Sequence, residues 1–104
     1  MVEFRLFIPV ASNTGTVFPA QHHTAFEREV LRLCGGYSLL HGIVSGAWLG
    51  KDTTYTDDSR VYVVAVGSVF EAGRIREIAE FALGLYEQES IYVGYLGFSE
   101  LVTR

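Results

Sequence analysis

The stretch RVYVVAVG, residues 60–67, constrains the fold of this chain more than any other segment. Valine and tyrosine favour β-strands, and successive side chains of a strand point to opposite faces of a sheet. The two faces of this strand carry Val61, Val63 and Ala65 on one side, and Tyr62, Val64 and Val66 on the other. Because neither set is polar, we predict a central strand that is covered on both faces.

Two β-α-β units of similar length are predicted from the periodicity of the apolar residues. Pro19 suits the first turn of a helix, and the pair Gly35-Gly36 ends it. Ser68 and Glu71 have the S-x-x-E spacing of a capping box at the start of a second helix. The expected strands span residues 2–10, 37–49, 60–67 and 91–97, the expected helices span 20–34 and 68–86, a polar loop spans 50–59, and a tail spans 98–104.

The predicted order of elements is β-α-β-β-α-β, which is the order of a ferredoxin-like sandwich. This α+β fold has a four-stranded antiparallel sheet with both helices on one face, and its first and third strands are central. A chain of 104 residues suits one domain, so a single ferredoxin-like domain spanning 1–104 is predicted.

The charged residues argue against a nucleic-acid partner. The chain has 12 acidic and 8 basic residues, a net charge of −4, and the basic residues form no stripe that could neutralise successive phosphates. The first residues lack a basic segment followed by a long apolar one, and no apolar run is long enough to span a bilayer. We therefore expect a soluble cytoplasmic protein with no nucleic-acid or membrane partner.

Cys34 is the only cysteine, so the chain has neither an internal disulfide nor a cysteine-based metal spacing. Its place on the apolar side of the first predicted helix indicates a buried structural thiol. His22 and His23 open that helix, with Glu27 one turn after His23, but two possible ligands do not make a metal site. We expect these side chains to be solvated. The loop at 12–16 lacks a phosphate-binding lysine and a dinucleotide glycine pattern, so no metal and no cofactor are expected.

The second face of the sheet determines the expected state of association. With both helices on one face, the other face must be polar and solvated or covered by another chain. Phe7, the alternate residues of the third strand and one or two tyrosines would make an apolar patch larger than a monomer usually exposes. We predict a homo-oligomer whose sheet faces pack together or whose edge strands join. The alternative is that the tail or the second strand folds over this face.

Residues near this face are the candidates for a ligand-binding or interface surface. Glu3 and Arg5 share the less apolar side of the first strand with Phe7, and Tyr95 lies in the last strand. Trp48 combines a large apolar area with one hydrogen-bond donor, which suits an anchor in a core or an interface. These residues form the predicted ligand or interface set.

His41 is the candidate for acid–base chemistry. It is expected in the middle of the second strand. Histidine ordinarily titrates near neutral pH and can act as acid or base when a carboxylate or a tyrosine fixes its tautomer. Tyr62 or Tyr92 would orient a substrate beside it in a small enzyme made by pairing ferredoxin-like domains. The structural alternative is a histidine satisfied by neighbouring polar groups at an interface.

Three short motifs accompany this order of elements: CGG at the end of the first helix, GAW at the end of the second strand, and QES before the last strand. Their positions are Gly35, Gly36, Gly46, Trp48, Gln88, Glu89 and Ser90. The pattern, over residues from about 25 to 96, resembles small uncharacterised bacterial and phage-borne proteins of ferredoxin-like type. The resemblance implies the fold and carries no established activity.

Two functions follow from these features. The first is a small non-enzymatic homo-oligomeric module that binds a protein partner or a small ligand through its sheet face or subunit interface, because no set of nucleophile, base and orienting residue can be assembled. The alternative is a small cofactor-free enzyme of the dimeric α+β barrel kind, an isomerase or oxygenase, with His41 as acid or base. The enzyme requires His41 to line a cavity with Glu3, Arg5 or a tyrosine within hydrogen-bond reach.

Overall fold

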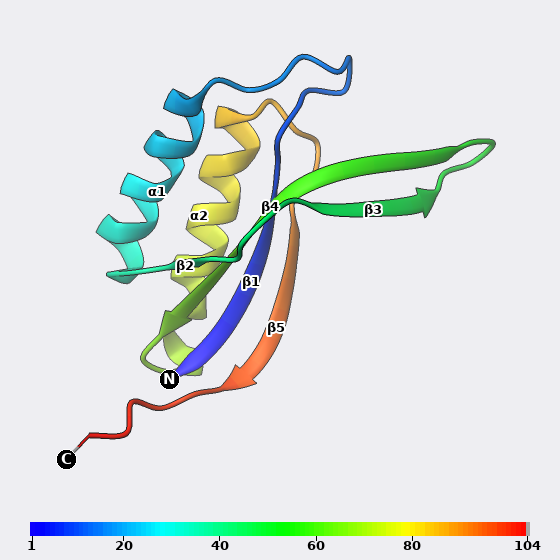
Figure 1. Ribbon diagram of the computed structural model, residues 1–104. Helices are drawn as coiled ribbons and strands as arrows, with labels where there is room; N and C mark the ends of the chain where they lie inside the picture. The colour runs from blue at the N-terminus through cyan, green and yellow to red at the C-terminus, as the bar shows by residue number, and fades with distance from the viewer. Residues whose placement is uncertain (104) are drawn as a thin grey trace.

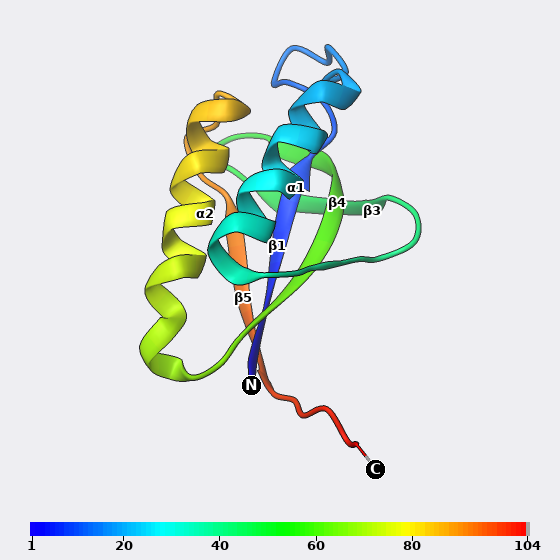
Figure 2. The same cartoon turned by 90° about the vertical axis from the view of Figure 1, so that its left-hand side faces the viewer.

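The computed structural model, which describes residues 1–103, consists of an antiparallel sheet with two helices packed against one face (Figures 1 and 2). Helix α1 spans Ala20–Cys34, and α2 spans Ala72–Leu85 after a short 3₁₀ turn, η1, at Val69–Glu71. The strands are β1 Val2–Pro9, β2 Ser38–Leu39, β3 Val44–Leu49, β4 Thr54–Val66 and β5 Tyr92–Phe98. The predicted α+β architecture is confirmed.

Strands β4 and β1 occupy the centre of the sheet, as predicted for the first and third strands. The order is β2-β4-β1-β5, with β3 also paired to β4, and these pairings are all antiparallel. Residues 61–66 of β4 pair with residues 2–7 of β1. The apolar stretch that constrained the fold is therefore a central strand.

The sheet has five strands rather than the predicted four. The expected second strand, 37–49, is interrupted at 40–43, and its two ends form β2 and β3. Gly42 has a φ of +86°, a left-handed conformation that glycine adopts without steric cost, so the chain bends out of the ladder there. His41 consequently lies in a bend and not in the middle of a strand.

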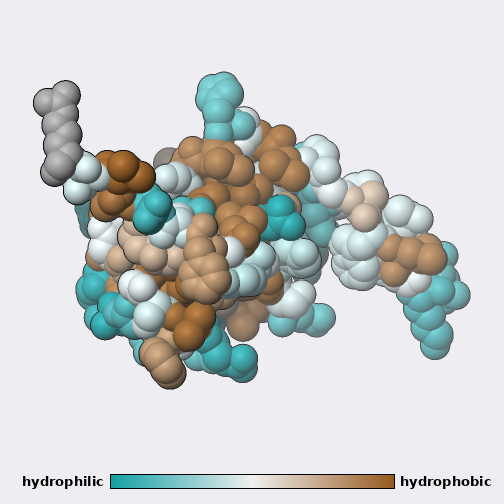
Figure 3. All heavy atoms as spheres, turned by 90° about the horizontal axis from the view of Figure 1, so that it is seen from below, coloured by the Kyte–Doolittle hydropathy of each residue, from teal (hydrophilic) through white to brown (hydrophobic). Residues whose placement is uncertain are grey.

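The predicted loop at 50–59 is another correction, because β4 begins at Thr54. Residues 44–58, comprising β3, the turn and the start of β4, form a two-stranded hairpin that we call the arm. The arm projects away from the sheet on the side opposite the helices (Figure 1), and it stands clear of the body when seen from below (Figure 3). The radius of gyration is accordingly 14.4 Å, above the roughly 13 Å of a compact domain of this length.

The hydrophobic core lies between the helices and the sheet. Its largest buried side chains include Tyr62, Tyr86 and Phe26, and the rings of Phe26 and Tyr62 meet edge to face at 4.9 Å. Helix α1 ends at the predicted place, since Gly35 has a φ of +83° and its N–H donates to the Leu31 carbonyl oxygen at 3.0 Å. This packing fixes the helices on one face.

The predicted capping box at the second helix does not form. The Ser68 side chain makes no hydrogen bond to the helix, and only the backbone N–H of Glu71 donates to the Ser68 carbonyl oxygen, at 3.0 Å. The chain first makes the turn η1, so α2 begins at Ala72 and not at Ser68.

The sheet face without helices, which we call the open face, has mixed chemistry. Paired residues of neighbouring antiparallel strands share a face. The open-face pairs of β1 and β4 are Glu3 with Ala65, Arg5 with Val63, and Phe7 with Val61. Within residues 1–103, neither helix combines the length and the apolar character needed to cross a membrane.

Candidate functional site

A groove of about 940 Å³ lies between the open face and the arm. Its floor comes from β1 and from Tyr92 at the start of β5, one wall comes from the arm, and the loop 88–91 closes one end. The bend of β4 creates this hollow, because the first half of that strand leaves the sheet with β3 while the second half stays in the centre (Figure 1). We call this hollow the open-face groove.

The inner side of the arm brings an aromatic pair and a carboxylate to the groove. Trp48 and Tyr55 are cross-strand partners, and their rings stack with centroids 4.7 Å apart. The indole N–H of Trp48 donates to Asp57 Oδ2 at 2.7 Å, which fixes the ring against the arm. Trp48 remains 54% exposed, so a large aromatic surface stays free for a ligand or a partner.

The floor of the groove combines a cation with two more aromatic rings. Phe7 and Tyr92 face each other across β1 and β5, edge to face, with centroids 5.1 Å apart. The guanidinium carbon of Arg5 lies 5.6 Å from the centroid of the Phe7 ring, within the range of a cation–π contact. The groove can therefore hold a flat molecule between aromatic surfaces with a positive group at its side.

The loop after α2 supplies polar groups at the end of the groove. Gln88, Glu89 and Ser90 all line it, and Gly46 lines it from the arm beside Trp48. Glu89 is exposed and makes no hydrogen bond or ion pair within residues 1–103. All positions of the GAW and QES motifs thus line one hollow, although the two motifs lie far apart in the sequence.

The structure brings together only part of the residues predicted from the sequence. Arg5, Phe7 and Trp48 line the open-face groove together with Tyr92. The other four do not line it: Glu3 lies further along the open face, Tyr95 packs edge to face on Phe4, Tyr62 is buried under α1, and His41 is exposed in its bend. Within the described residues, His41 makes no side-chain hydrogen bond and so has no orienting partner there.

Tyr55 and Asp57 were not among the predicted site residues, because the stretch TYTDDS was interpreted as a solvated loop. A usable signal was present: Tyr55, Asp57 and Ser59 have the same alternation as Val61 and continue the strand toward the N-terminus. Extending this alternation through the acidic stretch would have identified the inner side of the arm.

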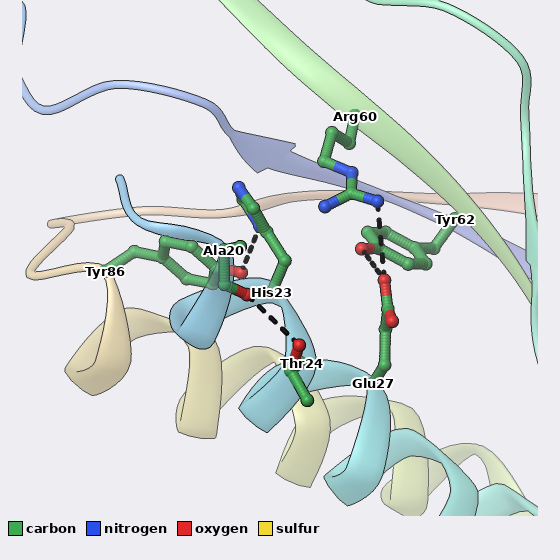
Figure 4. A network of polar contacts seen from close by, with 7 residues as sticks. All are labelled: Ala20, His23, Thr24, Glu27, Arg60, Tyr62 and Tyr86. Carbon is green, nitrogen blue, oxygen red and sulfur yellow. Dashed lines mark hydrogen bonds and ion pairs between the residues drawn. The ribbon is translucent and has the colours of Figure 1, made fainter. Parts of the chain in front are cut away.

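A second polar cluster lies partly buried between α1 and β4 (Figure 4). Glu27 accepts a hydrogen bond from the Tyr62 hydroxyl at 2.7 Å and pairs with Arg60, whose Nη2 lies 3.4 Å from the same carboxylate oxygen. Burial, and then the hydrogen bond to Glu27, raise the pKa of Tyr62 well above its usual range, so the phenol stays protonated. The cluster ties α1 to the central strand.

His23 belongs to the same side of α1, which corrects the expectation that His22, His23 and Glu27 are solvated. Its side chain is buried, and its Nδ1 shares a hydrogen bond with the Tyr86 hydroxyl at 2.7 Å (Figure 4). His23 falls in register with the buried residues Phe26 and Val30 of the helix stripe. This helical spacing was the signal in the sequence that predicts burial of His23.

Acidification is expected to destabilise the protein through His23. Burial, and then the nearby Arg60 guanidinium, lower the pKa of His23 below 6.5. In the unfolded chain the imidazole takes up a proton near its ordinary pKa, so the unfolded state binds more protons below that pH and stability falls as the pH falls. Chemical unfolding at about pH 7.5 and about pH 5.5 should show a smaller loss for His23→Gln than for the unaltered protein.

The matched control for this measurement is His22→Gln, which removes the adjacent histidine. Its ring is partly exposed and tilted against Phe18 at 5.3 Å, without the buried hydrogen bond of its neighbour. We expect His22→Gln to retain most of the pH dependence of the unaltered protein, because His22 is the smallest of the causes that lower the pKa of His23. Equal pH dependence in His23→Gln and the unaltered protein would contradict the assignment.

The remaining candidate groups give no metal or redox site in the described part of the chain. Residues 1–103 contain no group of three or more His, Cys, Asp and Glu side chains placed to hold a metal ion. Burial raises the pKa of the Cys34 thiol, which disfavours the reactive thiolate. The open-face groove is therefore the strongest candidate site.

Comparisons with known proteins concern the fold. No protein family model and no curated protein matches the chain. A phage SAM lyase in complex with S-methyl-5′-thioadenosine is similar over 92% of this chain and 80% of its own, with a TM-score of 0.70 and 12% identity. CutA1 from Oryza sativa is similar over 97% of this chain and 82% of its own, with a TM-score of 0.62 and 10% identity. These likenesses support a ferredoxin-like α+β fold.

Proposed function

We propose that this protein is a homo-oligomeric module that binds a small planar ligand of the nucleoside class in the open-face groove. Its subunits associate through the arm and the open face. The observation that carries the proposal is the arm itself, which exposes aromatic and aliphatic side chains on a hairpin that projects away from the helices (Figure 1).

The exposure of the arm supports association. All residues of β3 and the first residues of β4, Thr54–Asp58, are exposed, and Leu49 is 80% exposed. A two-stranded hairpin alone is marginally stable in water and normally needs a further layer. A second copy of the chain supplies that layer and also covers the half-buried apolar side chains of the open face, such as Phe7 and Val63.

The lining of the groove supports the ligand class. Flat aromatic surfaces line the groove from two sides, and they belong to Phe7, Trp48, Tyr55 and Tyr92. Stacking on aromatic side chains is a general way in which proteins bind a nucleobase, whichever base it is. A structurally similar protein, the phage SAM lyase, is in complex with S-methyl-5′-thioadenosine, which contains such a base. This nucleoside is therefore the first probe.

S-methyl-5′-thioadenosine is expected to change the fluorescence of Trp48, the only tryptophan of the chain, in a saturable manner. Trp48 lines the groove, so its emission reports occupancy directly. Tyr92→Ala should weaken binding about tenfold, because it removes one stacking surface. The control is Phe70→Ala, which alters a 95% exposed aromatic outside the groove and should leave the titration unchanged.

A non-saturable response, or equal affinities for Tyr92→Ala and the unaltered protein, would refute the groove as a nucleoside site. The same samples can test association, because a protein that stays a monomer of 11.6 kDa at the titration concentrations would refute the homo-oligomer. The two parts of the proposal are thus measured separately.

The second candidate function is an enzyme, and a specific feature favours it. Glu89 places a carboxylate without a partner in the described chain at the end of an aromatic groove, where it can attract the sulfonium of SAM. His41, the acid or base expected from the sequence, would need a neighbouring subunit to reach this groove. Replacing S-methyl-5′-thioadenosine by SAM in the same experiment distinguishes the functions: product formation that Glu89→Gln abolishes supports the enzyme.

A further inference from the structure

We propose that Arg5 is an oxyanion anchor of the open-face groove, so that the ligand carries a carboxylate or a phosphate beside its planar part. This inference rests on the proposed function, because it names a chemical group of the ligand in that same groove. The observation behind it is that the Arg5 side chain has neither an ion-pair partner nor a hydrogen-bond partner within residues 1–103.

Arg5 is a cation without a counter-ion in the described part of the chain. Four arginines form ion pairs with glutamates: Arg32, Arg60, Arg74 and Arg76. Arg5, Arg28 and Lys51 form none within residues 1–103, and of these three Arg5 lines the open-face groove. A guanidinium held in a partly buried place without an anion is an incomplete site, since charged groups away from water are normally paired.

The strands hold this guanidinium in place. Its plane lies near the Phe7 ring, 5.6 Å from carbon to centroid, and the side chain crosses β5 at Gly94. A Cβ at position 94 would stand 2.9 Å from Arg5 Nε and 3.2 Å from Arg5 Cγ, so the glycine leaves the room that the arginine occupies. Two neighbouring residues, Phe7 and Gly94, therefore define the position of the cation, which is not that of a free surface side chain.

The Arg5 guanidinium has no hydrogen-bond partner in the described part of the chain, so its terminal N–H groups remain to donate to an oxyanion. Its Nε–H is buried and has no hydrogen-bond partner, and the side chain makes no hydrogen bond to another residue of the described chain. A guanidinium matches the two oxygens of a carboxylate or a phosphate with parallel N–H donors. Tyr92 and Trp48 line the same groove, so one ligand can stack and pair with Arg5 together.

The test compares three probes that share one purine nucleoside: adenosine, adenosine 5′-monophosphate and adenosine-5′-carboxylic acid. Each is titrated against the full chain with Trp48 fluorescence, and free tryptophan corrects for absorbance by the probe. At least one anionic probe is expected to bind about tenfold or more tightly than adenosine, because a hydrogen bond to a charged group contributes a binding free energy of about that size. The stronger anion identifies the carboxylate or the phosphate as the preferred group.

Variants then assign this preference to Arg5. Arg5→Met keeps the apolar stem and should abolish the preference, leaving the anionic probe as weak as adenosine. Arg5→Lys keeps the charge but loses the paired donors and should retain only part of it. The control Arg28→Met removes one positive charge from the exposed surface of α1 and should keep the full preference.

Three results would overturn the inference. Equal affinities of the unaltered protein for all three probes would mean that the ligand needs no anionic group, while the groove remained a nucleoside site. An anion preference that survives Arg5→Met would assign it to another residue. Binding of none of the three probes would overturn the proposed nucleoside function along with the anchor.

Discussion

Leu49→Asp is expected to convert the proposed homo-oligomer into monomers of 11.6 kDa. Leu49 lies at the end of β3, is 80% exposed and does not line the open-face groove, so its side chain has no packing role within the subunit. Burial of a leucine at a subunit interface contributes about 1.5–3 kcal/mol, and a buried aspartate adds a desolvation cost. The dissociation constant of the oligomer should therefore rise about 100-fold or more.

Leu31→Asp is the matched control, because it places the same charge on a half-exposed leucine of α1, on the covered side of the sheet. Light scattering after size exclusion, at equal concentrations, should give the mass of the unaltered protein for this variant. Circular dichroism should show the same secondary structure for both variants. If Leu49→Asp keeps the mass of the unaltered oligomer, the end of the arm is not part of the interface.

Elements with a strong local signal could be predicted with close boundaries. The helix expected at 20–34 is α1 itself, because Pro19 and Gly35 act through backbone geometry that depends on few neighbours. The first strand was also predicted to within one residue, since its alternation runs without interruption. Local patterns identify such elements because the physical cause lies within the same segment.

The arm could not be predicted from local composition, because its stability depends on pairing across the hairpin. Asp57 and Asp58 favour loops as isolated residues. In the structure their carboxylates accept hydrogen bonds from Trp48 Nε1 at 2.7 Å and from Ser45 Oγ at 2.6 Å, and the strand continues through them. These contacts appear only when the two strands are in register.

The candidate site was predicted in part for the same reason. The alternation of β1 placed Arg5 and Phe7 on one face, and the aromatic character of Trp48 marked it as an anchor. The position of His41 depended on whether the second strand is continuous, and the left-handed Gly42 interrupts it. The bend at Gly42 thus places His41, the expected acid–base residue, outside the groove.

The buried cluster under α1 leads to the second large effect. Glu27→Leu is expected to lower the free energy of unfolding by about 2–3 kcal/mol, because the Tyr62 hydroxyl loses its acceptor and Arg60 loses its counter-ion. The side chains of Glu27 and Arg60 are 22% and 23% exposed, so water replaces part of the lost interaction. Unfolding should be followed by far-ultraviolet circular dichroism, since Trp48 lies on the exposed arm and does not report on the core.

Tyr62→Phe and the double variant separate the contributions within this cluster. Tyr62→Phe should cost about 1 kcal/mol, because it removes one hydrogen bond but leaves the ion pair. The double variant should be less destabilised than the sum of the two single variants, since the unpaired hydroxyl that penalises Glu27→Leu is then absent. Additive effects would mean that the two side chains are not coupled.

Glu80→Leu is the matched control for the loss of an ion pair. Glu80 pairs with Arg76 on the surface of α2, where the side chains are 60% and 83% exposed, and such pairs contribute about 0–1 kcal/mol. A small loss of unfolding free energy for Glu80→Leu, beside a large loss for Glu27→Leu, would show that the contribution of the cluster to stability depends on its partial burial. Equal effects would mean that Glu27 is an ordinary surface carboxylate, and that the attachment of α1 to the sheet rests on the apolar contacts around Phe26 alone.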